Sequence, residues 1–455
     1  MLPPGPGLPS PLQMSLYMAD PLSFLRKQRK RHGDTFTLRM SGMGEFVFVS
    51  APEDIKRIFN APPDALHAGE GNDVILPLVG SSSLVMQDGA EHIRLRRLLL
   101  PPFQGERLNT YAGPMREVAH ASLEQWPVGK PFPLLPRMMS LTIEILLRSV
   151  FGIEGQEELA LFARRFPRLV DSIASPLYLL PALSGVDVFQ KVPWLRASKM
   201  KREVDEALYA LIAHRRAQPA DPRRQDMLSL LLESRDEAGQ PLTDRELRDA
   251  LFTVIVAGYE TTAIGMCFTV ERLLCTPEAL ARVHEELERV VGGEEIQAEH
   301  LGQLEYLDAV IKEALRLRPV VPLVSRRTKV PFELSKYTLP PETMLVPGIA
   351  LTHLREDLYP EPDRFLPERF LGKKPDPYAW LPFGGGSRRC LGMALSLFEM
   401  KVVLATVLRR AKLRMASKRP IHMVRRSIMF APSGGMPVVL DEVRPRSSQP
   451  QKQVA

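Results

Sequence analysis

The sequence predicts a mainly α-helical protein with a smaller β-rich region. Six stretches carry apolar residues three and four positions apart, which is the spacing of one helix face. They span residues 89–100, 114–125, 139–152, 156–172, 196–217 and 278–292. A longer helical run extends from Asp244 to about Cys275, and β-rich runs lie near 36–50 and 332–345.

The N-terminal segment predicts an arm followed by a hairpin. Residues 1–12 are rich in proline and are expected to be extended. Between Phe36 and Ser50, two short β-rich runs flank a turn that contains Gly42 and Gly44. This order of residues predicts a β-hairpin.

The long run from Asp244 predicts a helix that crosses the molecule. Thr243 followed by Glu246 is typical of a capping box, and Pro277 is expected to begin the next helix. About thirty helical residues span roughly 45 Å, which is about twice the expected radius of gyration of roughly 22 Å. The apolar middle of this helix, residues 250–257, is therefore expected to be buried.

The C-terminal part predicts strands near 332–345, a helix over 391–410 and a pair of strands near 428–440. From Arg444 to Ala455 the chain has little apolar content and is expected to be disordered. Internal repeats and clear linkers are missing from the sequence, so residues 1–443 are expected to form a single domain.

The composition, with 45% apolar and 25% charged residues in 455, is typical of a soluble globular chain. The sequence has no run of about eighteen apolar residues, and its N-terminus does not resemble a secretory signal. The odd count of three cysteines, Cys267, Cys275 and Cys390, indicates a reducing compartment. We therefore expect a cytoplasmic protein without a transmembrane segment.

Residues 382–392, PFGGGSRRCLG, place Cys390 at the start of the predicted last helix. The glycines allow the backbone to approach a flat ligand closely. The helix N-terminus, together with Arg388 and Arg389, favours a thiolate, which binds soft metal centres. Zinc is disfavoured because no second Cys or His stands at ligand spacing. A structural cysteine and a thiol nucleophile both stay open on these grounds.

The spacing of Phe383, Gly386, Arg388, Cys390 and Gly392 resembles the haem-binding signature of the cytochrome P450 family. The resemblance extends over almost the whole chain and implies the cytochrome P450 fold. It also implies haem b (iron protoporphyrin IX) as cofactor, with Cys390 as the metal ligand.

The segment Ala257–Gly258–Tyr259–Glu260–Thr261–Thr262 resembles the oxygen-activation motif of the same family. A glycine inside a helix costs about 1 kcal/mol relative to alanine, so its presence calls for a functional reason. The resemblance implies that Ala257 and Gly258 are cofactor-binding residues and that Gly258 leaves room for a diatomic ligand. It assigns Glu260 and Thr261 as the catalytic residues that manage protons.

Two further sets of residues fit the resemblance. Glu313 and Arg316 stand three apart on one helix face and are implied to join Arg369 in a buried network that supports the haem loop. The implied cofactor-binding residues that meet the haem propionates are His92, Arg96, Arg326 and Arg388. Cys267 and Cys275 are expected to be core residues without assigned chemistry.

The resemblance implies a haem-thiolate monooxygenase that hydroxylates or epoxidises an apolar small molecule, such as a fatty acid, terpenoid or steroid, with a slight preference for fatty acids. The alternatives are a peroxygenase or isomerase of lipid peroxides, whose family members generally lack the acid-alcohol pair, and a non-enzymatic haem sensor. The expected pocket walls are the loop before His92, residues 175–194, Val254 and Ala257, residues 320–324 and residues 433–435.

Electrons are expected from a separate ferredoxin or flavodoxin with its reductase, because the chain leaves no length for a fused one. Between Leu381 and Arg426 stand eleven basic residues and one acid, a net charge of +10, compared with +7 for the whole chain. This excess predicts a docking face for an acidic electron donor. No nucleic-acid recognition motif accompanies it, and we expect a monomer.

Overall fold

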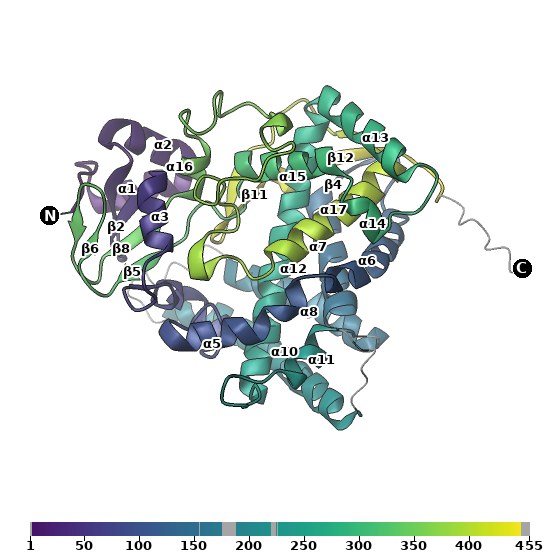
Figure 1. Ribbon diagram of the computed structural model, residues 1–455, viewed down its shortest axis with the longest axis horizontal. Helices are drawn as coiled ribbons and strands as arrows, with labels where there is room; N and C mark the ends of the chain where they lie inside the picture. The colour runs from purple at the N-terminus through teal and green to yellow at the C-terminus, as the bar shows by residue number, and fades with distance from the viewer. Residues whose placement is uncertain (1, 154, 175–187, 220–223, 225, 447–455) are drawn as a thin grey trace, which may run out of the picture.

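The structure is a computed structural model that describes residues 2–446 apart from 154, 175–187, 220–223 and 225. A β-rich part lies at one end of the long axis together with the N-terminus, and helices make up most of the remainder (Figure 1). The predicted fold class, mainly α with a smaller β-rich region, is confirmed.

Each of the six amphipathic stretches coincides with a helix in the structure. The described α-helices are α1 (Ser10–Ala19), α2 (Pro21–His32), α3 (Pro52–Phe59), α4 (Leu76–Val79), α5 (Gly89–Leu99), α6 (Arg107–Leu123), α7 (Leu134–Ile145), α8 (Gln156–Ala174), α10 (Val188–Ala217), α11 (Met227–Glu233), α12 (Asp244–Leu274), α13 (Pro277–Val291), α14 (Ala298–Leu301), α15 (Glu305–Leu317), α16 (Ile349–His353) and α17 (Met393–Arg410). A π-helical turn at Leu146–Val150 continues α7.

The strands in the described part of the chain form four small sheets. The largest has the order β1-β2-β8-β5-β3. Its strands are β1 (Thr35–Met40), β2 (Gly44–Val49), β3 (Leu66–His67), β5 (Arg326–Thr328) and β8 (Met344–Pro347). The remaining strands are β4 (Pro131–Pro133), β12 (Pro437–Val443) and β9 (Ala411–Met415) in one sheet, the pair β6 (Phe332–Glu333) and β7 (Thr338–Leu339), and the pair β10 (Met423–Arg426) and β11 (Met429–Pro432). The predicted hairpin is β1–β2, in which Phe36 pairs with Phe48 and the two rings stack 5.5 Å apart.

The long predicted helix is α12, which runs through the helical part (Figure 1). The Thr243 hydroxyl accepts a hydrogen bond from the Glu246 N–H (3.2 Å), and the Glu246 carboxylate accepts one from the Thr243 N–H (2.8 Å), so the capping box is confirmed. Among the described residues, α12 is the one helix long and apolar enough to cross a membrane, and 67% of its most apolar window is buried inside the protein.

The expected N-terminal arm is shorter than predicted, because α1 begins at Ser10. Pro11 lies in the first turn of this helix, where the missing N–H of proline costs no hydrogen bond. Asp20 then caps α2 by accepting a hydrogen bond from the Ser23 N–H (3.1 Å). The prediction of an extended arm is therefore wrong for residues 10–12, which belong to a helix.

The C-terminal segment also differs from the expectation in detail. The strands near 428–440 are not partners of each other, since β11 pairs with β10 while β12 pairs with β9 and β4. Arg444 donates its N–H to the Arg410 carbonyl (2.7 Å), and Arg446 pairs with Glu117, so the expected disorder does not begin at 444. The rest of the predicted tail, residues 447–455, lies outside the described residues.

Candidate functional site

Cys390 ends a glycine-rich loop that leads into α17. Gly384 and Gly386 have φ values of 65° and 66°, in the left-handed region. A Cβ atom on Gly386 would stand 2.0 Å from the Phe59 carbonyl oxygen of α3, so the loop requires glycine there. The Cys390 N–H donates to the Phe383 carbonyl (2.9 Å) and closes the loop. The spacing noticed in the sequence therefore has a geometric reason.

The thiol of Cys390 lies deep in the protein and yet faces open space. Cys390 is exposed, although burial is the main cause that raises the pKa of its thiol. Both observations hold if its free surface opens onto an internal space rather than the surrounding solvent. The Gly392 N–H and Arg96 lower this pKa. Arg96 is thus a cation that favours the thiolate and that the loop sequence alone did not indicate, while the contribution of Arg388 and Arg389 stays a prediction.

A short segment of α12 has its own exposed surface in the interior. Ala257 is exposed although most of α12 is buried. The Thr261 hydroxyl, one turn further on, donates to the Ala257 carbonyl (2.6 Å). Thr262 places this segment beside α17, because its hydroxyl lies 3.1 Å from that of Ser396. We infer that Ala257 and Cys390 face one internal space between α12 and the loop.

Gly258 has no side chain, so α12 takes up less space at this position than it would with any other residue. A Cβ atom there would meet only the Leu146 methyl groups, at 3.7 Å, so close helix packing does not by itself demand glycine.

Glu260 lies in a different environment from Thr261: it is 1% exposed and pairs with Arg426 of β10. Burial raises the pKa of the Glu260 carboxyl, and Arg426 partly offsets this effect. The acid-alcohol pair is thus split between two environments.

Four of the predicted cofactor-binding residues, His92, Arg96, Arg326 and Arg388, form a partly buried cluster that contains three guanidinium groups. His92, Arg326 and Arg388 line a small cavity of about 20 Å³. Burial, then Arg388 and Arg96, lower the pKa of His92 to about 4, and burial with Arg388 lowers the pKa of Arg326 to about 10. Asp88 is the acid that acts on this cluster, and it already accepts a hydrogen bond from Arg388. The cluster therefore has an excess of positive charge.

Arg326 shows what the cluster lacks. It is 7% exposed, and in the described part of the chain its guanidinium donates one hydrogen bond, to the Ser325 carbonyl (2.7 Å). A buried guanidinium without an acid is costly unless an anion pairs with it. A flat ligand with carboxylates at one edge and a soft metal facing Cys390 fits these residues.

The predicted supporting network is present and completely buried. Glu313 and Arg316 are both 0% exposed and form two hydrogen bonds of 2.6 and 2.8 Å. Arg369 donates to the same carboxylate at 3.2 Å.

His353 extends this network toward the loop and was missed in the sequence. Its Nδ1 lies 3.1 Å from the Arg316 carbonyl, and its Nε2 accepts a hydrogen bond from the Leu381 N–H (2.8 Å). Burial, then Arg316, lower the pKa of His353 to about 3, so the ring is neutral. His353 stands 37 residues after Arg316, and no local pattern in the sequence marked it.

The sequence model described as Cytochrome P450 matches residues 3–438. The chain belongs to the cytochrome P450 family. It is 41% identical over 412 residues to the cytochrome P450 135B1 of Mycobacterium tuberculosis (strain ATCC 25618 / H37Rv), which covers 90% of this chain and 85% of that protein. It is 35% identical over 440 residues to the cytochrome P450 137 of the same organism, with 94% and 90% covered.

Two solved structures share the cytochrome P450 fold. One is titled "Retinoic acid bound cyanobacterial CYP120A1" and has a TM-score of 0.83 at 26% identity, covering 97% of this chain and 100% of that one. The other is the haem domain of cytochrome P450DA, with a TM-score of 0.84 at 23% identity over 98% of this chain and 99% of that one. The fold, the haem cofactor and a monooxygenase activity in general follow from the family.

The large groove of this cytochrome P450 is not its haem site. A groove of about 770 Å³ lies between α7, α8 and the β10–β11 hairpin, and neither Cys390 nor Thr261 lines it. The chemistry of the side chains, and not cavity size, identifies the haem site.

The eleven basic residues between Leu381 and Arg426 do not form one free surface. Five are paired with acids from distant segments, namely Arg388 with Asp88, Lys401 with Asp308, Arg410 with Glu124, Arg414 with Asp441 and Arg426 with Glu260. The net charge counted along the sequence is therefore partly neutralised in space, and it does not by itself mark a docking face.

Proposed function

We propose that this cytochrome P450 oxidises an apolar small molecule of the fatty acid, terpenoid or steroid class and receives electrons from a separate ferredoxin or flavodoxin and its reductase. The observation that carries the substrate class is the apolar character of the α12 residues beside the haem site, Val254 and Ala257. An apolar surface loses free energy when an apolar ligand covers it, by about 25 cal/mol per Å².

Each site residue receives a role in this proposal. When bound, haem supplies the iron chemistry that activates O2, so that one oxygen atom enters the substrate and the other leaves as water. Cys390 would ligate the iron, with Phe383, Gly386 and Gly392 shaping its loop. Ala257 and Gly258 would line the opposite wall. Arg96, Arg326 and His92 would meet the haem carboxylates, whereas Arg388 is held by Asp88 and the Gln87 carbonyl.

Glu260 and Thr261 are proposed to supply protons. The raised pKa of Glu260 allows its carboxyl to hold a proton closer to neutral pH than an exposed glutamate does. Thr261 presents a hydroxyl at the internal space, and this hydroxyl can accept one proton while it donates another. Because the two side chains point apart, a water molecule between them would complete the transfer.

The proposed pocket walls are only partly brought together. The Phe430 N–H of β11 donates to the Val320 carbonyl (2.8 Å), so the hairpin adjoins the predicted wall at 320–324. The turn at 433–435 instead lies at the start of α7, where a Cβ atom on Gly435 would be 3.1 Å from Pro133. Of the predicted wall at 175–194, residues 175–187 lie outside the described residues.

The ligand bound by one protein of similar structure supports an apolar acid as the substrate. That protein, at 26% identity, binds retinoic acid according to its title. Retinoic acid combines an apolar chain with a carboxylate, as a fatty acid does.

The three cysteines are unpaired in the described residues, which supports a cytoplasmic location for the protein.

Titration of the haem-loaded protein tests this proposal. Retinoic acid, retinol, palmitic acid, a steroid and a charged sugar phosphate are added separately, and the haem absorption spectrum is followed. We expect a saturable spectral shift with the apolar compounds and none with the sugar phosphate. Product formation with a ferredoxin or flavodoxin system then identifies the substrate. Equal binding of the sugar phosphate, or no binding by any apolar compound, would contradict the proposed substrate class.

A further inference from the structure

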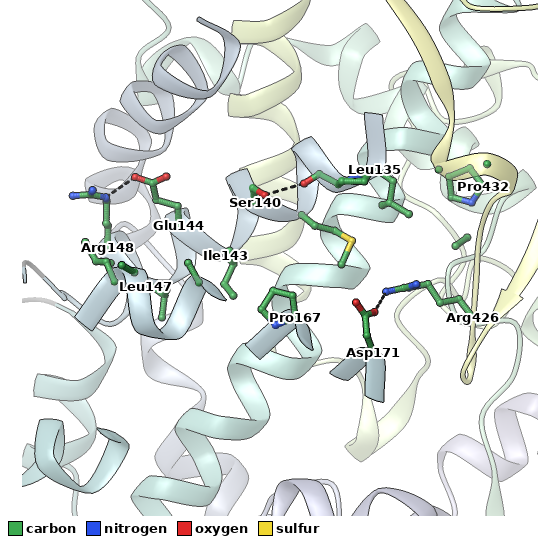
Figure 2. Close-up of a pocket in the computed structure, with 18 of the residues that line it drawn as sticks. Leu135, Ser140, Ile143, Glu144, Leu147, Arg148, Pro167, Asp171, Arg426 and Pro432 are labelled. Atoms are coloured by element: carbon green, nitrogen blue, oxygen red, sulfur yellow. Dashed lines mark hydrogen bonds and ion pairs between the residues drawn. The ribbon is translucent and has the colours of Figure 1, made fainter. Parts of the chain in front are cut away.

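The groove beside α7 and α8 leads to a catalytic residue. Its walls are largely apolar, and an ion pair lies at each end: Glu144 with Arg148, and Asp171 with Arg426 (Figure 2). Arg426 also pairs with Glu260, which is not part of the groove wall. One guanidinium therefore connects the groove to the buried carboxyl.

The accessibility of these side chains forms a gradient. Asp171 is 54% exposed, Arg426 is 30% exposed and Glu260 is 2% exposed. Arg426 uses its Nη2 for Asp171 and its Nε for Glu260, so the planar group serves both carboxylates at once. Polar groups thus continue from solvent to the middle of α12.

The hydroxyl of Tyr259 adds a second sign of a polar path. It is buried and has no hydrogen-bond partner within the described part of the chain. Burial is the main cause that raises its pKa, followed by the charges of Glu260 and Asp171, so it lies near both acids. A buried hydroxyl usually has a partner, and water reaching this place from the groove would provide one.

We propose that Arg426 is a positioning residue for Glu260 and that protons enter the site from solvent through this groove. The inference rests on the proposed function, in which Glu260 supplies protons. Glu260 gives a proton toward Thr261 and takes one from water at the groove, while the guanidinium keeps its charge throughout. Proton number is therefore conserved at Glu260 over each cycle.

The charges around Glu260 determine when its carboxyl holds a proton. Arg426 lowers the pKa of this carboxyl and Asp171 raises it, while burial raises it most. Tyr259 is neutral near pH 7 because its pKa is raised. Removing Arg426 and removing Asp171 should therefore move the titration of Glu260 in opposite directions, a result that general loss of structure would not produce.

The experiment compares Arg426→Gln and Asp171→Asn with Arg425→Gln as the matched control. Arg425 is the neighbouring residue, but its guanidinium donates to the Ser427 carbonyl (2.9 Å), whereas Glu260 is bonded by Arg426. Infrared spectra across pH report the neutral carboxyl band, which Glu260→Gln identifies by removing it. We expect Arg426→Gln to move the loss of this band upward by about 1–3 pH units and Asp171→Asn to move it downward. Arg425→Gln should leave it unchanged.

The pH profile for coupling of electrons to product should move in the same directions as the infrared band. Arg426→Lys should shift both less than Arg426→Gln does, because lysine keeps the positive charge. Thermal unfolding identifies a variant that has lost its fold. The inference is overturned if both substitutions shift the band in one direction or if both match Arg425→Gln. If Glu260→Gln leaves coupling unchanged, the proposed catalytic role of Glu260 fails, while the infrared shifts still decide whether Arg426 and Asp171 control its protonation.

Discussion

Two buried clusters of polar residues in this cytochrome P450 differ in how completely their side chains are paired. The supporting network of Glu313, Arg316, Arg369 and His353 is closed, because each charged group has several partners inside the protein. The cluster of Tyr259, Glu260 and Arg426 is open: within the described residues the Tyr259 hydroxyl has no hydrogen-bond partner, and the Arg426 guanidinium is shared between Glu260 and Asp171.

The difference corresponds to what each group has to do. A closed network fixes backbone positions, and every change of charge within it is costly. An open cluster costs stability but can gain and lose protons. Substitutions in the closed network should therefore change folding and haem retention. Substitutions in the open cluster or at its neighbour Thr261, together called the open side, should change how many electrons are coupled to product, with little effect on folding.

The largest effect is expected for Cys390→Ser, which removes the proposed iron ligand. Serine is nearly isosteric but provides no thiolate, so the carbon monoxide difference spectrum of the reduced protein should lose its haem-thiolate band and product formation should cease. Cys267→Ala should keep the band, because Cys267 is buried in the core of α12. An unchanged band in Cys390→Ser would refute the assignment of the ligand.

The next largest effect is expected for Glu313→Gln. This substitution leaves Arg316 buried without its charge partner, and breaking such a pair costs about 3–5 kcal/mol of unfolding free energy. Haem content should fall together with the midpoint of denaturant unfolding. Glu361→Gln is the control, because Glu361 forms a 2.6 Å ion pair with Arg364 at the surface, where loss of the pair costs about 0–1 kcal/mol. Equal effects of the two substitutions would show that burial does not matter here.

His353 should make the closed network sensitive to acid. Its pKa of about 3 lies well below its ordinary value of 6.5, so between these pH values the unfolded chain binds a proton that the folded protein does not. Stability is therefore lost as pH falls below 6.5. The contribution of this one group is about 1.4 kcal/mol per pH unit.

The measurement is the denaturation free energy from pH 7 to pH 4 for the wild type and for His353→Asn. Asparagine has no titratable group, so the slope below pH 6.5 should decrease by the contribution of one proton. His92, whose pKa is lowered to about 4, titrates in the same range in both proteins and cancels in the difference. Identical slopes would mean that His353 is not held neutral in the folded protein.

Much of the fold was predictable because it depends on local pattern. The helices that carry Thr261 and Glu313 have apolar spacing and capping residues that appear within a few positions. The departures occur where the signal was ambiguous or long-range: Pro11 belongs to a helix rather than an arm, and the strands near 428–440 take distant partners.

The site was predictable only as far as its spacing was informative. The cysteine loop and the buried set of Glu313, Arg316 and Arg369 could be named from motifs. The partner of Glu260 could not, because Arg426 stands 166 positions away in the sequence. The charge count near Cys390 was incomplete for the same reason, since the acids that pair with five of its basic residues come from other segments.

The smallest effect on stability is expected for Thr261→Ala, on the open side. The hydroxyl of Thr261 bonds within its own helix, to the Ala257 carbonyl at 2.6 Å, and alanine is a better helix former than threonine. The change in unfolding free energy should therefore stay within about 1 kcal/mol, and the haem-thiolate band should persist. Coupling of NADPH consumption to product should nevertheless decrease, with electrons appearing as hydrogen peroxide.

Thr269→Ala is the control for this last substitution. Thr269 lies in the same helix and donates in the same way to the Gly265 carbonyl (2.8 Å), but it is completely buried and does not reach the internal space. If the hydroxyl matters through proton supply, only Thr261→Ala should lose coupling. If it matters through the helix, both substitutions should have the same effect. Unchanged coupling in Thr261→Ala would mean that the Thr261 hydroxyl is not needed as a proton donor. The closed network and the open cluster would then differ only in packing and not in function.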